Sequence, residues 1–86
     1  MVLFVPGSDS LKDKRQIIKS MLDHVRNKFN VSAAELGMLD SHKQAELGFV
    51  CVSNSQAVVN GMLNKIMDFI NSNPLCEVVN SKLEFV

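Results

Sequence analysis

The chain has 86 residues, of which 47% are hydrophobic and 21% charged, and its formal net charge at pH 7 is zero. This length allows one domain and is too short for two. A dedicated nucleic-acid-binding domain usually carries a clear excess of Lys and Arg, which is missing here. Any contact with a polyanion must therefore depend on one local patch.

The apolar segments give no sign of a secreted or membrane protein. Residues 1–5 lack the basic residues that open a signal peptide, and a Pro-Gly turn follows them directly. No apolar run approaches the roughly 20 residues that cross a bilayer. Only two cysteines, Cys51 and Cys76, are present, which is typical of a reducing compartment. We therefore expect a cytoplasmic protein that does not enter the membrane.

The first predicted elements are a short strand and a long helix. Residues 1–5 form the apolar strand. Residues 10–29 carry apolar side chains with a period of 3.6, which is typical of a helix with one buried face. Ser10 and Asp13 have the spacing of a capping box at its start. Asn30 is a candidate for a left-handed residue at its end.

Two further strands are predicted in the middle of the chain. They span residues 31–36 and 45–52. The segment 37–44 between them is longer than the usual hairpin loop of roughly two to five residues. Because residues 47–52 are continuously apolar, we expect the third strand to be central and buried on both faces.

A second helix and a last strand complete the chain. Residues 55–72 repeat the helical pattern, with a second capping signal at Ser53 and Gln56. The pair at 73–74 is Asn-Pro, which stops the helix. Residues 76–86 predict a strand with apolar side chains on both faces.

This order of elements, βαββαβ, predicts an α+β fold. Right-handed crossovers turn it into a four-stranded antiparallel sheet of strand order 4-1-3-2, with both helices on one face. Such a fold is the ferredoxin-like plait. No predicted element remains to cover the opposite sheet face, which makes that face a candidate surface for a homodimer or a protein partner. Scattered exposed valines, which are normal, are the alternative interpretation.

Three sequence blocks resemble the bacterial YlxP-like family and occur in the family's order. They are PGSDSLKDKR at 6–15, FNVSAAELG at 29–37 and LGFVCVSN at 47–54. The resemblance covers nearly the whole chain and indicates a single YlxP-like domain, residues 1–86. It implies a ferredoxin-like fold. In some bacteria the family's gene lies among genes for translation initiation and ribosome maturation, which implies a role linked to the ribosome or to RNA. The family's function is unknown, so no catalytic residues carry over.

The chain departs from the family pattern at two places. Relatives usually begin several residues earlier, so either this start is a late one or the first strand is truncated, with weaker central pairing. His42 stands where many relatives carry Trp, so an aromatic contact by this loop is not expected.

The helix at residues 10–29 carries the candidate site residues. Its six Lys and Arg outnumber Asp13 and Asp23, an excess of four positive charges. Four of the six lie within about 60° of one another around the helix axis. Such a row can follow a phosphate backbone; a solvated helix face is the alternative. The candidate phosphate or RNA contacts are Lys12, Arg15, Lys19 and Arg26, with Lys14 nearby.

The turn before this helix is the second candidate site, for an anion. Backbone N–H groups at a helix start can hold a phosphate, and Gly7 permits close approach. However, Pro6 lacks a donor, Asp9 and Asp13 repel an anion, and Ser10 already caps the helix. We therefore favour a simple cap.

The cysteines, the histidines and Phe49 do not match the pattern of a further site. The strands of Cys51 and Cys76 should lie roughly 9–10 Å apart, beyond the ~7 Å limit of a disulfide, so we expect buried free thiols. His24 and His42 lack the spacing of metal ligands. Phe49 is predicted to be a core residue rather than a base-stacking ring. We expect no enzyme activity, no cofactor and no metal; the expected partners are ribosomal RNA or a ribosomal subunit, and a second copy of the chain.

Overall fold

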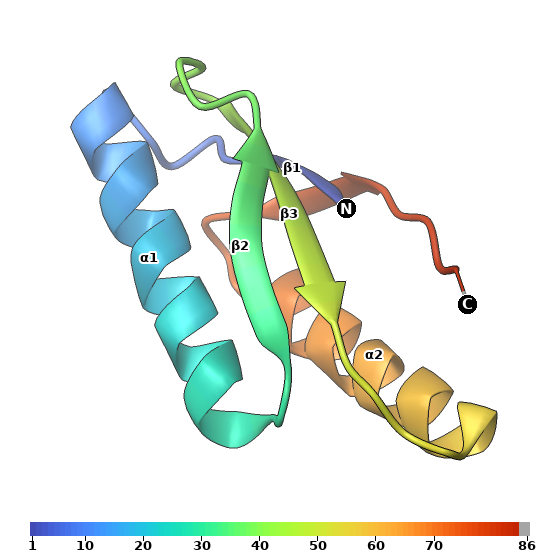
Figure 1. Ribbon diagram of the computed structural model, residues 1–86. Helices are drawn as coiled ribbons and strands as arrows, with labels where there is room; N and C mark the ends of the chain where they lie inside the picture. Colours follow the sequence, from blue (N-terminus) through green and yellow to red (C-terminus); the bar gives the residue numbers. More distant parts are fainter. Residues whose placement is uncertain (85–86) are drawn as a thin grey trace.

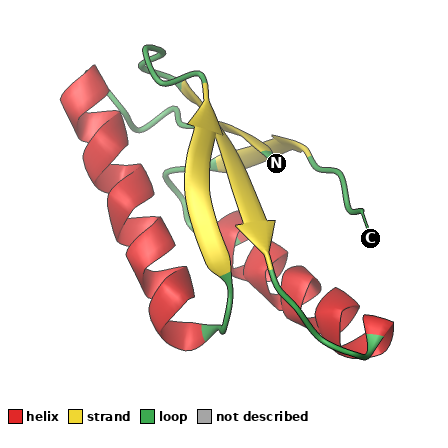
Figure 2. Ribbon diagram, viewed as in Figure 1, coloured by secondary structure: helices red, strands yellow, loops and turns green. Residues whose placement is uncertain are grey.

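The computed structural model describes residues 1–84 and contains four strands and two helices in the predicted order (Figure 1). The elements are β1 (Val2–Phe4), α1 (Leu11–Lys28), β2 (Ser32–Gly37), β3 (Gln44–Val50), α2 (Gln56–Asn71) and β4 (Glu77–Asn80). All neighbouring strands are antiparallel and form one sheet of order β2-β3-β1-β4 (Figure 2). The predicted ferredoxin-like α+β plait is confirmed.

A single core lies between one sheet face and the two helices. Leu3 of β1 pairs with Ala45 of β3, and both are fully buried beside Leu47. Ile66 and Ile70 close the core from α2. Because alternate side chains of a strand point to opposite faces, these buried positions define one covered face of the sheet. Helix α1 contributes Ile18, Met21, Leu22 and Val25 to the same cluster.

Each helix begins at a serine whose side chain caps it. Ser10 Oγ accepts a hydrogen bond from the Asp13 N–H at 3.1 Å, as predicted. The second cap is Ser55, whose Oγ accepts from the Val58 N–H at 3.3 Å. The prediction of Ser53 as this cap is wrong, because the helix begins two residues later. Each cap satisfies one of the backbone donors that have no partner in the first turn.

The end of α1 also differs from expectation. Phe29 follows the helix in an extended conformation, with φ −124° and ψ 145°. Asn30 is therefore not a left-handed cap, because the chain turns directly into β2. Among residues 1–84, Met38 is the one residue other than glycine with positive φ, at 58°.

Strand β3 is central, as predicted, but it is not buried on both faces. Ala45 and Leu47 are fully buried, whereas Val50 is 65% exposed. The strand ends at Val50, so Cys51 and Val52 lie beyond it. A continuous apolar run does not distinguish two covered faces from one, and here the helices cover only one.

The last strand is shorter than the predicted residues 76–86. It pairs only with β1, and this pairing stops at Val2 opposite Asn80. Beyond Asn80, β4 has no strand to pair with, so it ends there. The part of the prediction that falls on residues 85–86 lies outside the described residues.

Exposed apolar side chains gather on the other face of the sheet. Leu36 is 63% exposed and Val79 is 61% exposed, and both point away from the core-facing positions, like Val50. Leu36 lies over Gly48 of β3, where an added Cβ would meet its side chain at 2.5 Å. Strands β2, β3 and β4 therefore each present a branched apolar side chain on this face, which we call the open sheet face.

Candidate nucleic-acid interface

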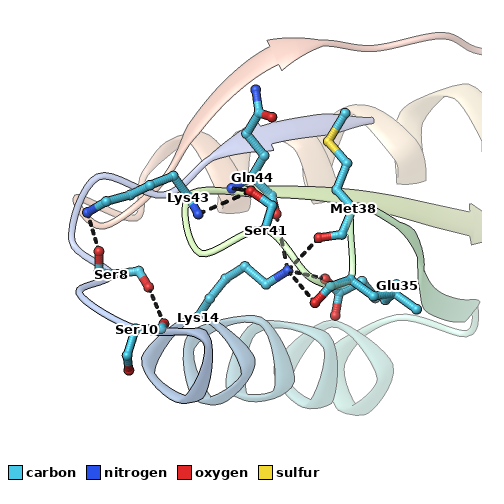
Figure 3. A network of polar contacts seen from close by, with 9 residues as sticks. Ser8, Ser10, Lys14, Glu35, Met38, Ser41, Lys43 and Gln44 are labelled. Atoms are coloured by element: carbon cyan, nitrogen blue, oxygen red, sulfur yellow. Dashed lines mark hydrogen bonds and ion pairs between the residues drawn. The ribbon is translucent and has the colours of Figure 1, made fainter.

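Lys14, one of the predicted RNA contacts, is fully buried inside the protein. Its side chain extends toward the segment between β2 and β3 (Figure 3). The Nζ atom lies 3.0 Å from Glu35 Oε2. It also donates hydrogen bonds to the carbonyl of Met38 at 2.9 Å and that of Gln44 at 3.1 Å. The prediction that Lys14 contacts RNA is therefore wrong.

The spacing of residues along α1 explains this burial. Lys14 follows Leu11 by three positions and precedes Ile18 by four, so all three share one helix face. That face is the one packed on the sheet. A buried ammonium is stable only with acceptors around it, and the carboxylate and backbone carbonyls provide them.

The turn before α1 is held by a lysine side chain from the segment between β2 and β3. Lys43 Nζ donates to the Pro6 carbonyl at 3.2 Å and also to that of Ser8. The Ser8 N–H is bonded within the turn, and the Asp9 N–H donates to the Asp13 carboxylate at 3.3 Å. The N–H groups of Ser8, Asp9 and Asp13 are thus occupied within the protein, and the preferred interpretation of Ser10 as a cap is confirmed.

The other four predicted contacts, Lys12, Arg15, Lys19 and Arg26, are exposed on α1 and are called the basic row below. Asp23 pairs with Lys19 at 3.0 Å and with Arg26 at 3.2 Å. Arg26 also donates to a backbone carbonyl of β2. Within residues 1–84, Lys12 and Arg15 have no ion-pair partner. The row thus begins with two unpaired cations and ends with two that share a carboxylate.

Asp23 keeps its charge next to these cations. The hydrogen bond from Lys19 lowers the pKa of its carboxyl below the ordinary value. Partial desolvation opposes this effect, and the charges of Lys19 and Arg26 add to it. With Lys14 paired inside the protein, the exposed Lys and Arg of α1, including Lys28, number five against Asp13 and Asp23. An excess of three positive charges remains on this helix.

An aromatic stack that the sequence analysis does not predict connects the two helices. His24 of α1 lies on Phe69 of α2 with ring centroids 4.3 Å apart and an angle of 7° between the ring planes. His24 remains exposed, and Phe69 is half-buried. A local pattern cannot reveal this contact, because the two residues come from different helices that only the fold brings together.

A groove runs beside this stack between α1 and α2. Ile17 and Met21 line it from α1, and Asn73 lies beyond the end of α2. His24 and Phe69 form part of its wall. Gln16 and Ser20 add polar groups, so the α1 lining of the groove is of mixed polarity, with an aromatic pair at one side.

The remaining candidates carry no further site. Cys51 and Cys76 are free thiols, as predicted, although Cys51 is only half-buried. Burial raises the pKa of the Cys76 thiol. Phe49 packs against the core, as predicted. Among residues 1–84, no three His, Cys, Asp or Glu side chains lie close enough together to bind a metal ion. No helix in the same range is both long and apolar enough to cross a membrane.

Together, these features define a small βαββαβ plait domain with a basic first helix and one uncovered sheet face. A family profile described as protein of unknown function (DUF503) matches residues 1–83. The chain is also 37% identical over 76 residues to the uncharacterized protein YlxP of Bacillus subtilis (strain 168), a match that covers 88% of this chain and 83% of that protein. The chain therefore belongs to the DUF503 family, and the resemblance to YlxP-like proteins is confirmed.

Proposed function

We propose that the protein is a non-enzymatic accessory protein that binds ribosomal RNA through the basic row of α1. The main support for this proposal is that Lys12 and Arg15 are exposed and form no ion pair among residues 1–84. They lie on the same side of α1 as Lys19 and Arg26. The gene neighbourhood implied by the family resemblance points to the ribosome as the place of action.

The geometry of the row suits a phosphate backbone. A helix rises about 1.5 Å per residue, so Lys12 and Lys19 are separated by about 10 Å along the axis of α1. Each cation that neutralises a phosphate releases counterions and so contributes to affinity. Since Asp23 already engages Lys19 and Arg26, and the net charge is zero, the binding should be modest and strongly dependent on salt.

Co-sedimentation of the protein with ribosomal subunits from its own cells, at low and high salt, tests this proposal. We expect association with one subunit at low salt and its loss at high salt. The variant Lys12→Glu with Arg15→Glu should abolish most of the association, because it reverses the charge at the two positions that form no ion pair. Its matched control is Lys65→Glu with Lys82→Glu, which changes the charge equally outside α1. If the two variants associated equally with the subunit, the role of the basic row would be contradicted.

A second candidate function is homodimerisation through the open sheet face. It is supported by three exposed apolar side chains on that face, Leu36, Val50 and Val79. Sedimentation equilibrium should then show association that strengthens with concentration and is lost in Val50→Lys. Monomeric behaviour at high concentration would contradict it. The two functions are compatible, because a dimer formed in this way displays two copies of α1.

A further inference from the structure

The His24 ring is held in a fixed plane by its contact with Phe69. The ring planes differ by only 7°, with the centroids 4.3 Å apart, so one face of the imidazole is supported by the phenyl ring. The side chain is nevertheless exposed. A flat group that stacks on His24 would meet a side chain that is already ordered, which lowers the entropy cost of binding.

His24 also borders a shallow hollow on α1 that reaches the basic row. Lys19 lines this hollow together with His24. Gln16, Ser20 and Asn27 also line it, and their amides and hydroxyl both donate and accept hydrogen bonds. The hollow therefore combines a cation, an aromatic ring and neutral polar groups.

The charge near the stack favours an anionic ligand. Lys28 follows His24 by four positions, so it lies one turn further along the same helix face, and it is exposed. Asp23 is the one carboxylate among the residues that line the hollow, and Lys19 and Arg26 already bind it. A group that carries both a flat ring and a phosphate fits this arrangement.

We propose that His24 on Phe69 is a stacking platform for an unpaired base of single-stranded RNA. The strand crosses α1, with its phosphates on the basic row and one base against His24. This inference rests on the proposed function and narrows it, because paired bases in a duplex are not free to stack on a side chain. The protein should therefore prefer an unpaired strand to a duplex of the same sequence.

Fluorescence anisotropy with two labelled strands of equal length tests the platform. One strand is a uridine RNA and the other has the same sugar-phosphate backbone without bases. His24→Ala should weaken binding of the uridine strand at least about fivefold, as expected when a base loses a stacking partner. It should leave binding of the strand without bases unchanged. His24→Phe should bind the uridine strand like the wild type, since it keeps an aromatic ring.

His42→Ala is the matched control, because it removes the other histidine from an exposed loop. Circular dichroism establishes that each variant is folded at the assay temperature. If His24→Ala weakened the binding of both strands equally, the platform would be overturned, since the stack would then only stabilise the packing of α1 on α2. Unchanged binding in His24→Ala, beside weakened binding in Lys12→Glu with Arg15→Glu, would overturn the platform alone. No binding of either strand by the wild type at low salt would overturn the RNA function as well.

Discussion

Lys14 Nζ lies 3.0 Å from Glu35 Oε2, with Lys14 fully buried and the Glu35 side chain 17% exposed. This ion pair joins α1 to β2. The same ammonium group donates to the Met38 and Gln44 carbonyls, one at each end of the segment between β2 and β3 (Figure 3). One lysine thus fixes both the packing of the first helix and the path of this segment.

Lys14→Met should strongly destabilise the fold. The substitution puts an apolar side chain of similar length in its place. It leaves the Glu35 carboxylate without its ion-pair partner and the carbonyls of Met38 and Gln44 without their donor. Breaking a buried pair from one side costs about 3–5 kcal/mol, a large part of the roughly 5–15 kcal/mol that stabilises a small domain. Urea denaturation measures the change in the free energy of unfolding.

The exposed Lys12→Met on the same helix is the control, and its free energy of unfolding should change by no more than about 0.5 kcal/mol. A Lys14→Met midpoint equal to that of Lys12→Met would show that the buried ion pair does not stabilise the fold.

Much of this arrangement was predictable from local sequence. The apolar period placed α1 and α2 to within one residue at each end, and Ser10 was identified as the first cap. The burial of Lys14 was also within reach, since its spacing from Leu11 and Ile18 puts it on the apolar face. The prediction of Lys14 as an RNA contact rests on its place in the sequence between Lys12 and Arg15, because its angle on the helix leaves it outside the row of the other four cations.

Other features depend on contacts that no local pattern contains. The end of β4 at Asn80 depends on how far β1 extends opposite it. The stack of His24 on Phe69 depends on how the two helices lie relative to each other. Which cations of the basic row form ion pairs depends on side-chain conformation, because Asp23 is within reach of both Lys19 and Arg26.

Asp23 should titrate below the ordinary carboxyl range. The hydrogen bond from Lys19 stabilises the carboxylate, so the pKa of Asp23 in the folded protein is lowered from 3.8. The resulting contribution to stability is complete above the pKa of the unfolded chain and disappears as the pH falls through the folded pKa. Carboxyl chemical shifts followed by NMR against pH measure this value.

In Lys19→Ala the pKa of Asp23 should rise toward its ordinary value, whereas in Lys12→Ala it should not move. An Asp23 pKa that is insensitive to Lys19→Ala would show that the ion pair is not maintained in solution.

The two thiols should react at different rates. Burial raises the pKa of Cys76, so less of the reactive thiolate is present there at neutral pH, and the side chain is also shielded. Cys51 is half-buried just beyond β3. A disulfide reagent should label Cys51 first and Cys76 only when the protein opens.

Cys51→Ser should therefore lose the fast phase of labelling, and Cys76→Ser should keep it. A fast phase that persists in Cys51→Ser would contradict the burial of Cys76 in the core.

The most direct test of the RNA-binding account is the salt dependence of binding to a short single-stranded RNA. Each phosphate contact contributes about −0.7 to the slope of log K against log salt. The account predicts a clearly negative slope for the wild type and a slope about 1.4 smaller in magnitude for Lys12→Glu with Arg15→Glu. A slope near zero for the wild type, or an unchanged slope in this variant, would contradict it.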